Sequence, residues 1–376
     1  MASSINEEST PLLKHPPTQK KPISRTLLAT VMAGLIVLGA CNFVSIKVMY
    51  ASYGGRYAYF ASQGVNVLYL VFGGMVLYPL MCCTNQITAA ERNTPGLHRK
   101  FFIMGVLDCF GTFLAAIGNV YTPGQYQPLL NQTLIPLTLL FSFLGLGTRF
   151  RRLEVTGALL IMLGACCSVL PALWEPHQSS KMRWYSVLLY FSSNIPMALS
   201  TVYKEASFGD ATIHVYYLTQ WVSFWQFLFG FVLMPLQMIP GFGTPHGASL
   251  ADLQRDFYGG FRCYLQLIPE CRENRAFLLL TGYTAINFLF NTLGLFLTKH
   301  GSAVLNGMSY AILLPLTTVA FAFPFLGRFR EHITPFTVAG LAIVLGGFVL
   351  YQHFSYGVEG GAGGSPLTTP VRGVAA

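Results

Sequence analysis

A short pattern of residues occurs twice in this sequence, first as Ile135-Pro-Leu-Thr138, Arg149-Phe-Arg151 and Gly157-Ala-Leu-Leu-Ile-Met-Leu-Gly164. The second copy reads Leu314-Pro-Leu-Thr317, Arg328-Phe-Arg330 and Gly340-Leu-Ala-Ile-Val-Leu-Gly-Gly347. Chance likeness between Leu-rich segments is the alternative, but shared Pro, Arg-x-Arg and Gly landmarks in one order favour a duplication. The sequence therefore predicts two related halves, about 25–175 and 183–356.

Composition indicates the environment of both halves. Of the 376 residues, 53% are hydrophobic and only 10% are charged, with a mean hydropathy of +0.51. An average soluble chain carries about 25% charged residues, so a soluble domain of this size is excluded. Apolar stretches of the length that crosses a bilayer as a helix lie near 27–49, 59–81, 101–121, 125–147, 153–173, 185–204, 215–239, 276–299, 302–326 and 333–354.

These stretches divide equally between the two halves. An odd number of helices in each half forces the halves into opposite orientations across the membrane. We therefore predict an all-α polytopic membrane protein whose ten transmembrane helices form two inverted five-helix repeats. Lys and Arg are more frequent on the side of the chain ends than in the short segments opposite, which predicts that both termini are cytosolic. The basic clusters thus signal topology rather than nucleic-acid binding.

Polar tails flank this helical region of 25–356. Residues 1–24 and 357–376 are rich in Pro or Gly and are predicted to be disordered cytosolic tails. The first tail contains Glu8-Ser-Thr-Pro-Leu-Leu13, in which Glu8, Leu12 and Leu13 match an acidic dileucine signal. Sorting adaptors read such signals on cargo for lysosomes and vacuoles, although patterns this short also arise by chance.

A long loop at about 240–275 falls on the lumenal side of this topology. Apolar residues recur there at helical spacing, as Leu250, Leu253, Phe257 and Phe261. The pattern predicts an amphipathic helix on the membrane surface, capped by Ser249. Cys263 and Cys271 share the loop, and an oxidising lumen favours a disulfide between them. Two free thiols are the alternative that the sequence leaves open.

Several local motifs resemble one transporter family. They are Leu107-Asp108-Cys109, Gly118 with Thr122-Pro-Gly124, and Gln127 with Gln132-Thr-Leu-Ile-Pro136. Together with the cysteine-bearing loop, they make most of residues 40–354 similar to the chloroquine-resistance-transporter-like (CRT-like) family. That family belongs to the drug/metabolite transporter superfamily, whose fold has five-plus-five inverted repeats.

The resemblance implies a vacuolar, lysosomal or plastid carrier. Relatives move small peptides, amino acids, thiols such as glutathione, or cationic drugs, often together with protons. Family members typically carry more cysteines in the loop, so a single bridge would be a reduced version here. This chain also has Phe290 beside Asn291 where the family often places an acidic residue. That departure puts in question whether cation or proton chemistry carries over intact.

Polar residues within the apolar stretches are the candidates for a solute and proton pathway. Asp108 would bind a proton or a cationic solute, or else serve as a structural acid. Lys47 matches a family position that sets the charge of the cavity, unless it extends to the lumenal interface. The amides either contact solute or join helices; they are Asn42, Asn119, Gln127, Asn131, Gln132, Asn287, Asn291 and Asn306. Joining helices is the commoner role, but the amides from Asn119 to Gln132 surround a hairpin interrupted by Pro123-Gly124 and are expected to face the cavity. Tyr310 is a candidate lining residue, and Pro136 and Pro315 are candidate hinges.

The sequence lacks the motifs of several other classes of protein. There is no P-loop, no metal-type His/Cys spacing, and no gathering of catalytic residues within the apolar stretches, so we expect neither an enzyme nor a bound cofactor. The expected partners are a small solute, protons, the bilayer and sorting adaptors. Antiport of nucleotide sugars and a non-transport receptor or scaffold are the alternatives. A vacuolar or lysosomal membrane is favoured over a plastid envelope, and the oligomeric state is left open.

Overall fold

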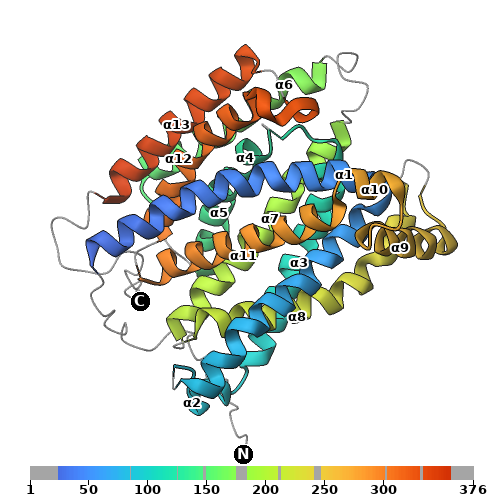
Figure 1. Cartoon of the computed structure of the whole chain (residues 1–376). Coiled ribbons are helices and arrows are strands. Elements are labelled where there is room, and N and C mark those ends of the chain that lie inside the picture. The colour runs from blue at the N-terminus through green and yellow to red at the C-terminus, as the bar shows by residue number, and fades with distance from the viewer. Residues whose placement is uncertain are drawn as a thin grey trace, which may run out of the picture.

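The computed structural model describes residues 24–84, 86–124, 126–146, 150–174, 184–210, 213–240, 247–300, 303–330 and 333–356. Within these ranges the protein is helical and contains no strand (Figure 1). The helices are α1 Arg25–Cys83, α2 Ala89–Arg92, α3 Leu97–Tyr121, α4 Tyr126–Asn131, α5 Leu134–Leu146, α6 Arg152–Trp174, α7 Trp184–Asp210, α8 Val215–Leu233, η1 Met234–Met238, α9 Leu250–Tyr264, α10 Pro269–Glu273, α11 Ala276–His300, α12 Ala303–Ala322, η2 Pro324–Phe329 and α13 Pro335–Tyr356.

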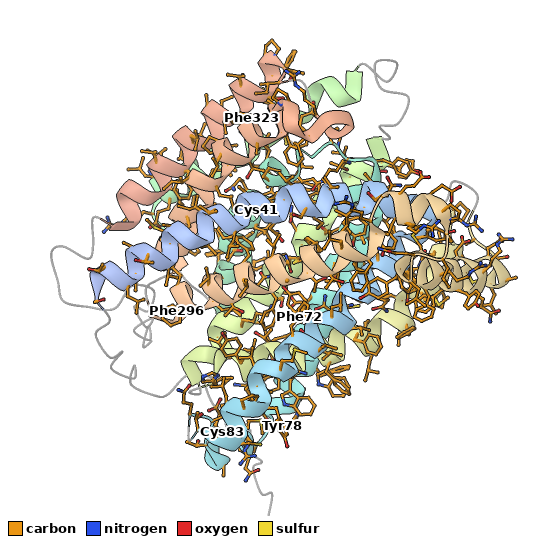
Figure 2. The ribbon with its side chains drawn as sticks, in the orientation of Figure 1. Cys41, Phe72, Tyr78, Cys83, Phe296 and Phe323 are labelled. Carbon is orange, nitrogen blue, oxygen red and sulfur yellow. A yellow bond between two sulfur atoms is a disulfide. The ribbon has the colours of Figure 1, made fainter. Side chains whose placement is uncertain are left out.

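The long helices have the character of membrane helices. Five stretches among the described residues are long and apolar enough to cross a bilayer, namely Thr26–Cys83, Leu97–Tyr121, Tyr126–Gly145, Val215–Met238 and Ala276–Leu297. Large apolar side chains remain exposed on the outside of the bundle. Tyr78 is 73% exposed and Phe323 is 51% exposed, and both are labelled in Figure 2. Contact with lipid explains this exposure, which water would disfavour.

The first two predicted membrane helices join without a loop, in the single 59-residue element α1. Its direction changes at Gly54, where φ is 66° and ψ is 176°. Glycine adopts this left-handed backbone without the Cβ clash that other residues meet.

The two ends of the bundle are named as follows. The end with Gly54 and α9–α10 is called the kink end, and the end with Arg25, Cys83 and Leu97 is called the tail end (Figure 1).

The predicted helix at 125–147 is not continuous, which corrects the sequence prediction. It divides into α4 and α5 at Gln132 and Thr133. Asn194 of α7 stabilises the break, because its amide nitrogen donates to the Leu130 carbonyl at 2.9 Å and to the Thr133 hydroxyl at 3.0 Å. Pro136 therefore lies in the first turn of α5, where a helix has no backbone partner for an N–H group.

Pro315 has a different setting from Pro136. It lies inside the continuous helix α12, where proline removes a backbone hydrogen bond. The two candidate hinges thus match in sequence but not in local structure. Their hinge role stays a prediction.

Helices α6 and α13 pack backbone to backbone through the glycines of the sequence repeat. A Cβ atom added to Gly157 would lie 2.7 Å from the Gly347 carbonyl oxygen, and one added to Gly347 would lie 2.7 Å from the Gly157 carbonyl oxygen. Gly164 and Gly340 face each other in the same way, with corresponding distances of 2.8 and 2.6 Å. Only glycine allows such close approach between two membrane helices.

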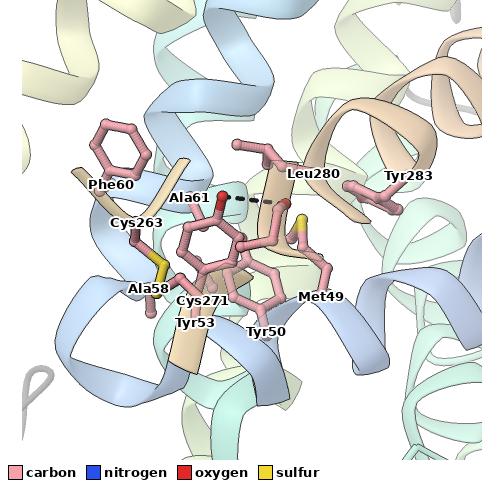
Figure 3. Close-up of a cluster of buried hydrophobic side chains, with 12 residues drawn as sticks. Met49, Tyr50, Tyr53, Ala58, Phe60, Ala61, Cys263, Cys271, Leu280 and Tyr283 are labelled. Atoms are coloured by element: carbon pink, nitrogen blue, oxygen red, sulfur yellow. Dashed lines mark hydrogen bonds between the residues drawn. A yellow bond between two sulfur atoms is a disulfide. The ribbon is translucent and has the colours of Figure 1, made fainter. Parts of the chain in front are cut away.

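The loop helix α9 packs on the kink of α1 (Figure 3). Ser249 caps the helix by accepting a hydrogen bond from the Asp252 backbone N–H. Leu253 is buried and Phe257 packs against the cluster around Phe60, while Leu250 and Phe261 stay exposed. The predicted surface helix is therefore held partly by protein contacts. Hydrogen bonds from Ser249 lower the pKa of Asp252, so the cap persists at mildly acidic pH.

A disulfide joins Cys263 to Cys271, and both residues are buried beside Tyr53 and Phe60 (Figure 3). It ties α9 to α10 just before α11 begins. We expect the double variant Cys263→Ser/Cys271→Ser to lose about 2–3 kcal/mol of local stability, since the unfolded loop regains conformational freedom. Limited proteolysis of purified protein should then cut within 250–275 while the rest of the chain stays protected.

The free cysteine Cys166, exposed on α6, supplies the matched control. Cys166→Ser should leave the proteolytic pattern unchanged. Equal resistance of the double variant and the wild type would show that packing alone holds the loop.

Part of the sequence prediction lies outside the described residues. The dileucine residues Glu8, Leu12 and Leu13, the tail 357–376 and Arg149 of the repeat are among these positions, as is the side chain of Asn306. The predictions made for them stand as predictions.

Candidate functional site

Four polar side chains meet between the two arms of α1 and α11. The Asn287 amide donates to the Asn42 side-chain oxygen at 2.8 Å. Tyr69 donates its hydroxyl hydrogen to the Asn287 side-chain oxygen. Asn291 donates to the Tyr69 hydroxyl at 2.8 Å and to the Asn287 side-chain oxygen at 3.0 Å. We call Asn42, Tyr69, Asn287 and Asn291 the central cluster.

The central cluster is uncharged and rich in donors and acceptors. Asn42 is buried, Tyr69 and Asn287 are partly buried, and Asn291 is exposed within an otherwise apolar helix. Phe290, next to Asn291 in the chain, packs edge to face on Tyr310 of α12 with ring centroids 5.8 Å apart. The site thus offers amide and hydroxyl groups, and the ring of Phe288 packs edge to face on Tyr69. Such chemistry suits hydrogen bonding to a polar solute and gives no preference for one sign of charge.

A stripe of polar residues leads from the central cluster along the second arm of α1. Tyr59, Gln63, Asn66 and Tyr69 follow at helical spacing and therefore share one face. Asn66 donates to the Gln63 side-chain oxygen at 2.9 Å, and Gln63 donates to the Tyr59 hydroxyl at 3.1 Å. Tyr59 in turn donates to the Gly230 carbonyl of α8 at 2.9 Å.

The sequence interpretation of 59–81 as a plain apolar helix did not include this stripe, nor Tyr69, the one member of the central cluster that is not an asparagine. Polar side chains three and four residues apart in an apolar helix are the signal that identifies both.

An ion pair joins α3 to α7 in the half of the bundle nearer the tail end. The Lys204 ammonium lies 2.6 Å from Asp108 Oδ2, and the two side chains are 22% and 15% exposed. Tertiary packing creates this pair, because α3 and α7 lie side by side and bring Asp108 within reach of Lys204. The charges of this partly buried pair compensate each other.

Lys47 binds the C-terminal end of α3. Its ammonium donates to the backbone carbonyls of Asn119 at 3.2 Å, Val120 at 3.4 Å and Thr122 at 2.6 Å. The last carbonyls of a helix carry partial negative charge and lack intrahelical donors, so a cation there is stabilising. The structure therefore adds a capping role that neither of the sequence interpretations of Lys47 anticipated.

The amides around the turn after α3 bond to protein groups. Asn119 and Gln127 are fully buried and exchange two hydrogen bonds, of 3.3 and 3.1 Å. Asn131 hydrogen-bonds the Tyr190 hydroxyl, and Gln132 is buried at the break between α4 and α5. Their arrangement joins helices, which is the commoner role of amides in membrane proteins.

The predicted site residues therefore form separate groups rather than one site. Asn42 and Asn291 meet through Asn287, whereas Asp108 binds Lys204 and Lys47 binds the end of α3. No group of three or more His, Cys, Asp or Glu side chains suited to a metal occurs among the described residues.

Most of the chain matches a known family. The model for "CRT-like, chloroquine-resistance transporter-like" proteins covers residues 27–351. The chain belongs to the CRT-like family. This is the family that the motifs around Asp108 and Gln127 resemble, so the sequence interpretation is confirmed. This CRT-like chain is a membrane transporter, in keeping with its relatives.

Individual relatives come from distant organisms. Crt homolog 3 of Dictyostelium discoideum is 30% identical over 358 residues, which are 89% of this chain and 74% of the relative. The chloroquine resistance transporter of Toxoplasma gondii is 33% identical over 68% of this chain, but over only 30% of its own length. Protein CLT2, chloroplastic, of Arabidopsis thaliana is 26% identical over 88% of this CRT-like chain and 77% of its own.

A solved crystal structure shares the fold of this CRT-like chain. The two superpose with a TM-score of 0.51 over 89% of this chain and 100% of the other, at 14% sequence identity. Likeness at this identity concerns the fold alone.

Proposed function

We propose that this chain is a secondary active transporter that moves small organic solutes across a vacuolar or lysosomal membrane by alternating access, coupled to protons. The candidate solutes are short peptides, amino acids, thiols such as glutathione, and cationic drugs. The central cluster is the observation that carries the proposal. Polar side chains are rare within membrane helices and often mark solute pathways, so a hydrogen-bonded network of four such side chains between apolar helices points to a function beyond packing.

The chemistry of the central cluster favours neutral or zwitterionic solutes. Amide and phenol groups can replace several hydrogen bonds that a peptide or amino acid loses on leaving water. The exposed Asn291 amide is the group in the cluster most accessible to a solute. Tyr310 and Phe290 add an aromatic surface for apolar or cationic portions of the solute.

The ion pair between Asp108 and Lys204 supports proton coupling. Protonation of the Asp108 carboxylate removes its charge and weakens the contact that joins α3 to α7. A proton would thereby change the relative stability of two arrangements of these helices. Lys47 would hold the end of α3 during this movement, and the break before Pro136 and the interior Pro315 would serve as pivots.

The glycine contacts between α6 and α13 support the inverted repeat. Gly157 corresponds to Gly340 in the sequence repeat, and Gly164 corresponds to Gly347. If each residue of the contact between Gly157 and Gly347 is replaced by its counterpart in the other repeat, the result is the contact between Gly340 and Gly164, which the structure also contains. Contacts that map onto each other in this way are expected for two antiparallel repeats about a two-fold axis. In the proposed topology the kink end is lumenal and both tails are cytosolic.

A vacuolar or lysosomal membrane is the proposed location. The dileucine-like residues Glu8, Leu12 and Leu13 would bind sorting adaptors. The chloroplastic relative keeps the plastid envelope as the second candidate. Antiport of nucleotide sugars by the same fold would require a site for phosphate charge, whereas the central cluster is uncharged. A receptor or scaffold would have no need of paired inverted halves.

Transport by purified protein in liposomes tests the proposal. The solutes would be glutathione, a dipeptide, a basic amino acid and a cationic drug, each with and without an acid-inside pH gradient. We expect gradient-dependent flux of at least one class. Asn287→Leu should lower that flux about tenfold or more, because it breaks hydrogen bonds to both Asn42 and Tyr69.

Leu289 supplies the matched control on the same helix, since it is exposed and takes no part in the central cluster. Leu289→Ala should transport as the wild type does. If Asn287→Leu transports solute as fast as the wild type does, the central cluster is not part of the solute pathway. Absence of flux for every solute would favour the nucleotide-sugar or non-transport alternatives.

A further inference from the structure

A small cavity lies at the kink end, away from the central cluster. Its walls come from the kink of α1, the end of α3 and the short helix η1 after α8. The lining residues are Gly55, Ala58, Tyr59, Ile117, Val120, Tyr121 and Gln237. The space is about that of one water molecule, which is also the space of one ligand oxygen atom.

Gln237 brings an unused hydrogen-bond donor to this cavity. Its side-chain nitrogen is buried and has no hydrogen-bond partner among the described residues. A buried amide nitrogen without an acceptor costs free energy, so the site is suited to a ligand that carries an acceptor oxygen. No carboxylate lines the cavity to supply that acceptor.

The electrostatics of the cavity wall favour an anionic acceptor. The C-terminal carbonyls of α3 would by themselves repel an anion, because that end of a helix carries about half a negative charge. The Lys47 ammonium binds the carbonyls of Asn119, Val120 and Thr122, and Val120 also lines the cavity. A full positive charge therefore outweighs the partial negative charge next to the cavity.

The cavity adjoins the polar stripe of α1. Tyr59 lines it and also accepts a hydrogen bond from Gln63, which is bonded to Asn66. One turn further along the same face lies Tyr69 of the central cluster. A continuous polar face thus connects the cavity to the central cluster through a stretch that is otherwise apolar.

We propose that this cavity is the lumenal binding subsite for a carboxylate group of the transported solute, with Gln237 as the donor. The inference rests on the proposed transport function and adds a specificity-determining residue to it. In this structure the subsite accommodates one carboxylate oxygen, and movement of α1 about Gly54 would widen it. A solute would bind Gln237 first and then follow the stripe to the central cluster.

Transport kinetics provide the first test. A dipeptide and the same dipeptide with an amidated C-terminus would be supplied to the face of the kink end. Gln237→Leu keeps the approximate size of the side chain but removes the donor. We expect the KM for the dipeptide to rise about tenfold, and that for the amidated form to rise about threefold at most, because hydrogen bonds to charged acceptors are stronger. Gln254→Leu, exposed on α9, should change neither KM.

Thiol labelling provides a second test that does not depend on transport. The dipeptide should slow the reaction of Val120→Cys, which places a thiol in the cavity wall and keeps Gln237, with a membrane-impermeant maleimide, and the amidated dipeptide should slow it less. The chain without this substitution gives the background from the native cysteines. Unchanged KM values, or labelling that the dipeptide does not slow, would mean that the cavity holds only water. If the wild type moves no solute, the proposed function fails, and labelling alone decides the subsite.

Discussion

Asp108→Asn is expected to abolish the dependence of solute uptake on a proton gradient. The substitution removes the carboxylate that lies 2.6 Å from the Lys204 ammonium. It leaves a partly buried positive charge without its counter-ion, at a cost of about 2–4 kcal/mol. It also removes the group that would bind the transported proton. Uptake into proteoliposomes with and without an acid-inside gradient measures the first effect, and thermal unfolding in detergent measures the second.

The neutral double variant Asp108→Asn/Lys204→Gln separates these two causes. It removes both charges, so it should regain most of the stability that the single variant loses. If the ion pair is merely structural, the double variant should regain gradient-driven uptake together with stability. Proton coupling through Asp108 predicts that stability returns but dependence on the gradient does not. If neither variant changes solute uptake, Asp108 is a structural acid, and exchange of one solute for another is favoured over proton coupling.

Gly347→Ala is expected to destabilise the bundle by adding a methyl group where α13 and α6 pack backbone to backbone. The new Cβ atom would lie 2.7 Å from the Gly157 carbonyl oxygen and 2.9 Å from the Ile161 backbone nitrogen. Both are backbone atoms that can move only if α6 and α13 separate along their length. Overpacking of this kind costs about 1–3 kcal/mol. Thermal unfolding of the purified protein measures the loss.

The neighbouring residue provides the control for this prediction. A Cβ atom added to Gly346 would meet nothing within 4 Å. Gly346→Ala should therefore leave stability unchanged or raise it slightly, since alanine favours helix more than glycine does. An equal loss in both variants would contradict the close helix packing. Gly164→Ala, the counterpart of Gly347→Ala in the repeat, should destabilise the protein to a similar extent.

The sequence alone was sufficient for the class, the family and the approximate positions of the helices. Each predicted apolar range falls on helices of the structure, and the motifs around Asp108 and Gln127 indicated the family that the comparison then confirmed. These features are encoded locally, because the hydrophobic length of a segment decides whether it can cross a bilayer as a helix. The same local information singled out Asp108, Lys47 and the intramembrane amides as unusual.

The hydrogen-bond and ion-pair partners of these residues, and the way in which successive helices connect, could be determined only from the tertiary structure. Nothing in the sequence pairs Lys204 with Asp108, yet the Lys204 ammonium reaches that carboxylate on another helix. The break at Gln132 depends on Asn194 from α7, and the direct join of two helices at Gly54 has no hydropathy signal. Hydropathy reports only whether a segment is apolar. It does not specify which faces of distant helices meet, and in lipid those contacts depend on side-chain shape and hydrogen bonding, which are properties of the assembled bundle.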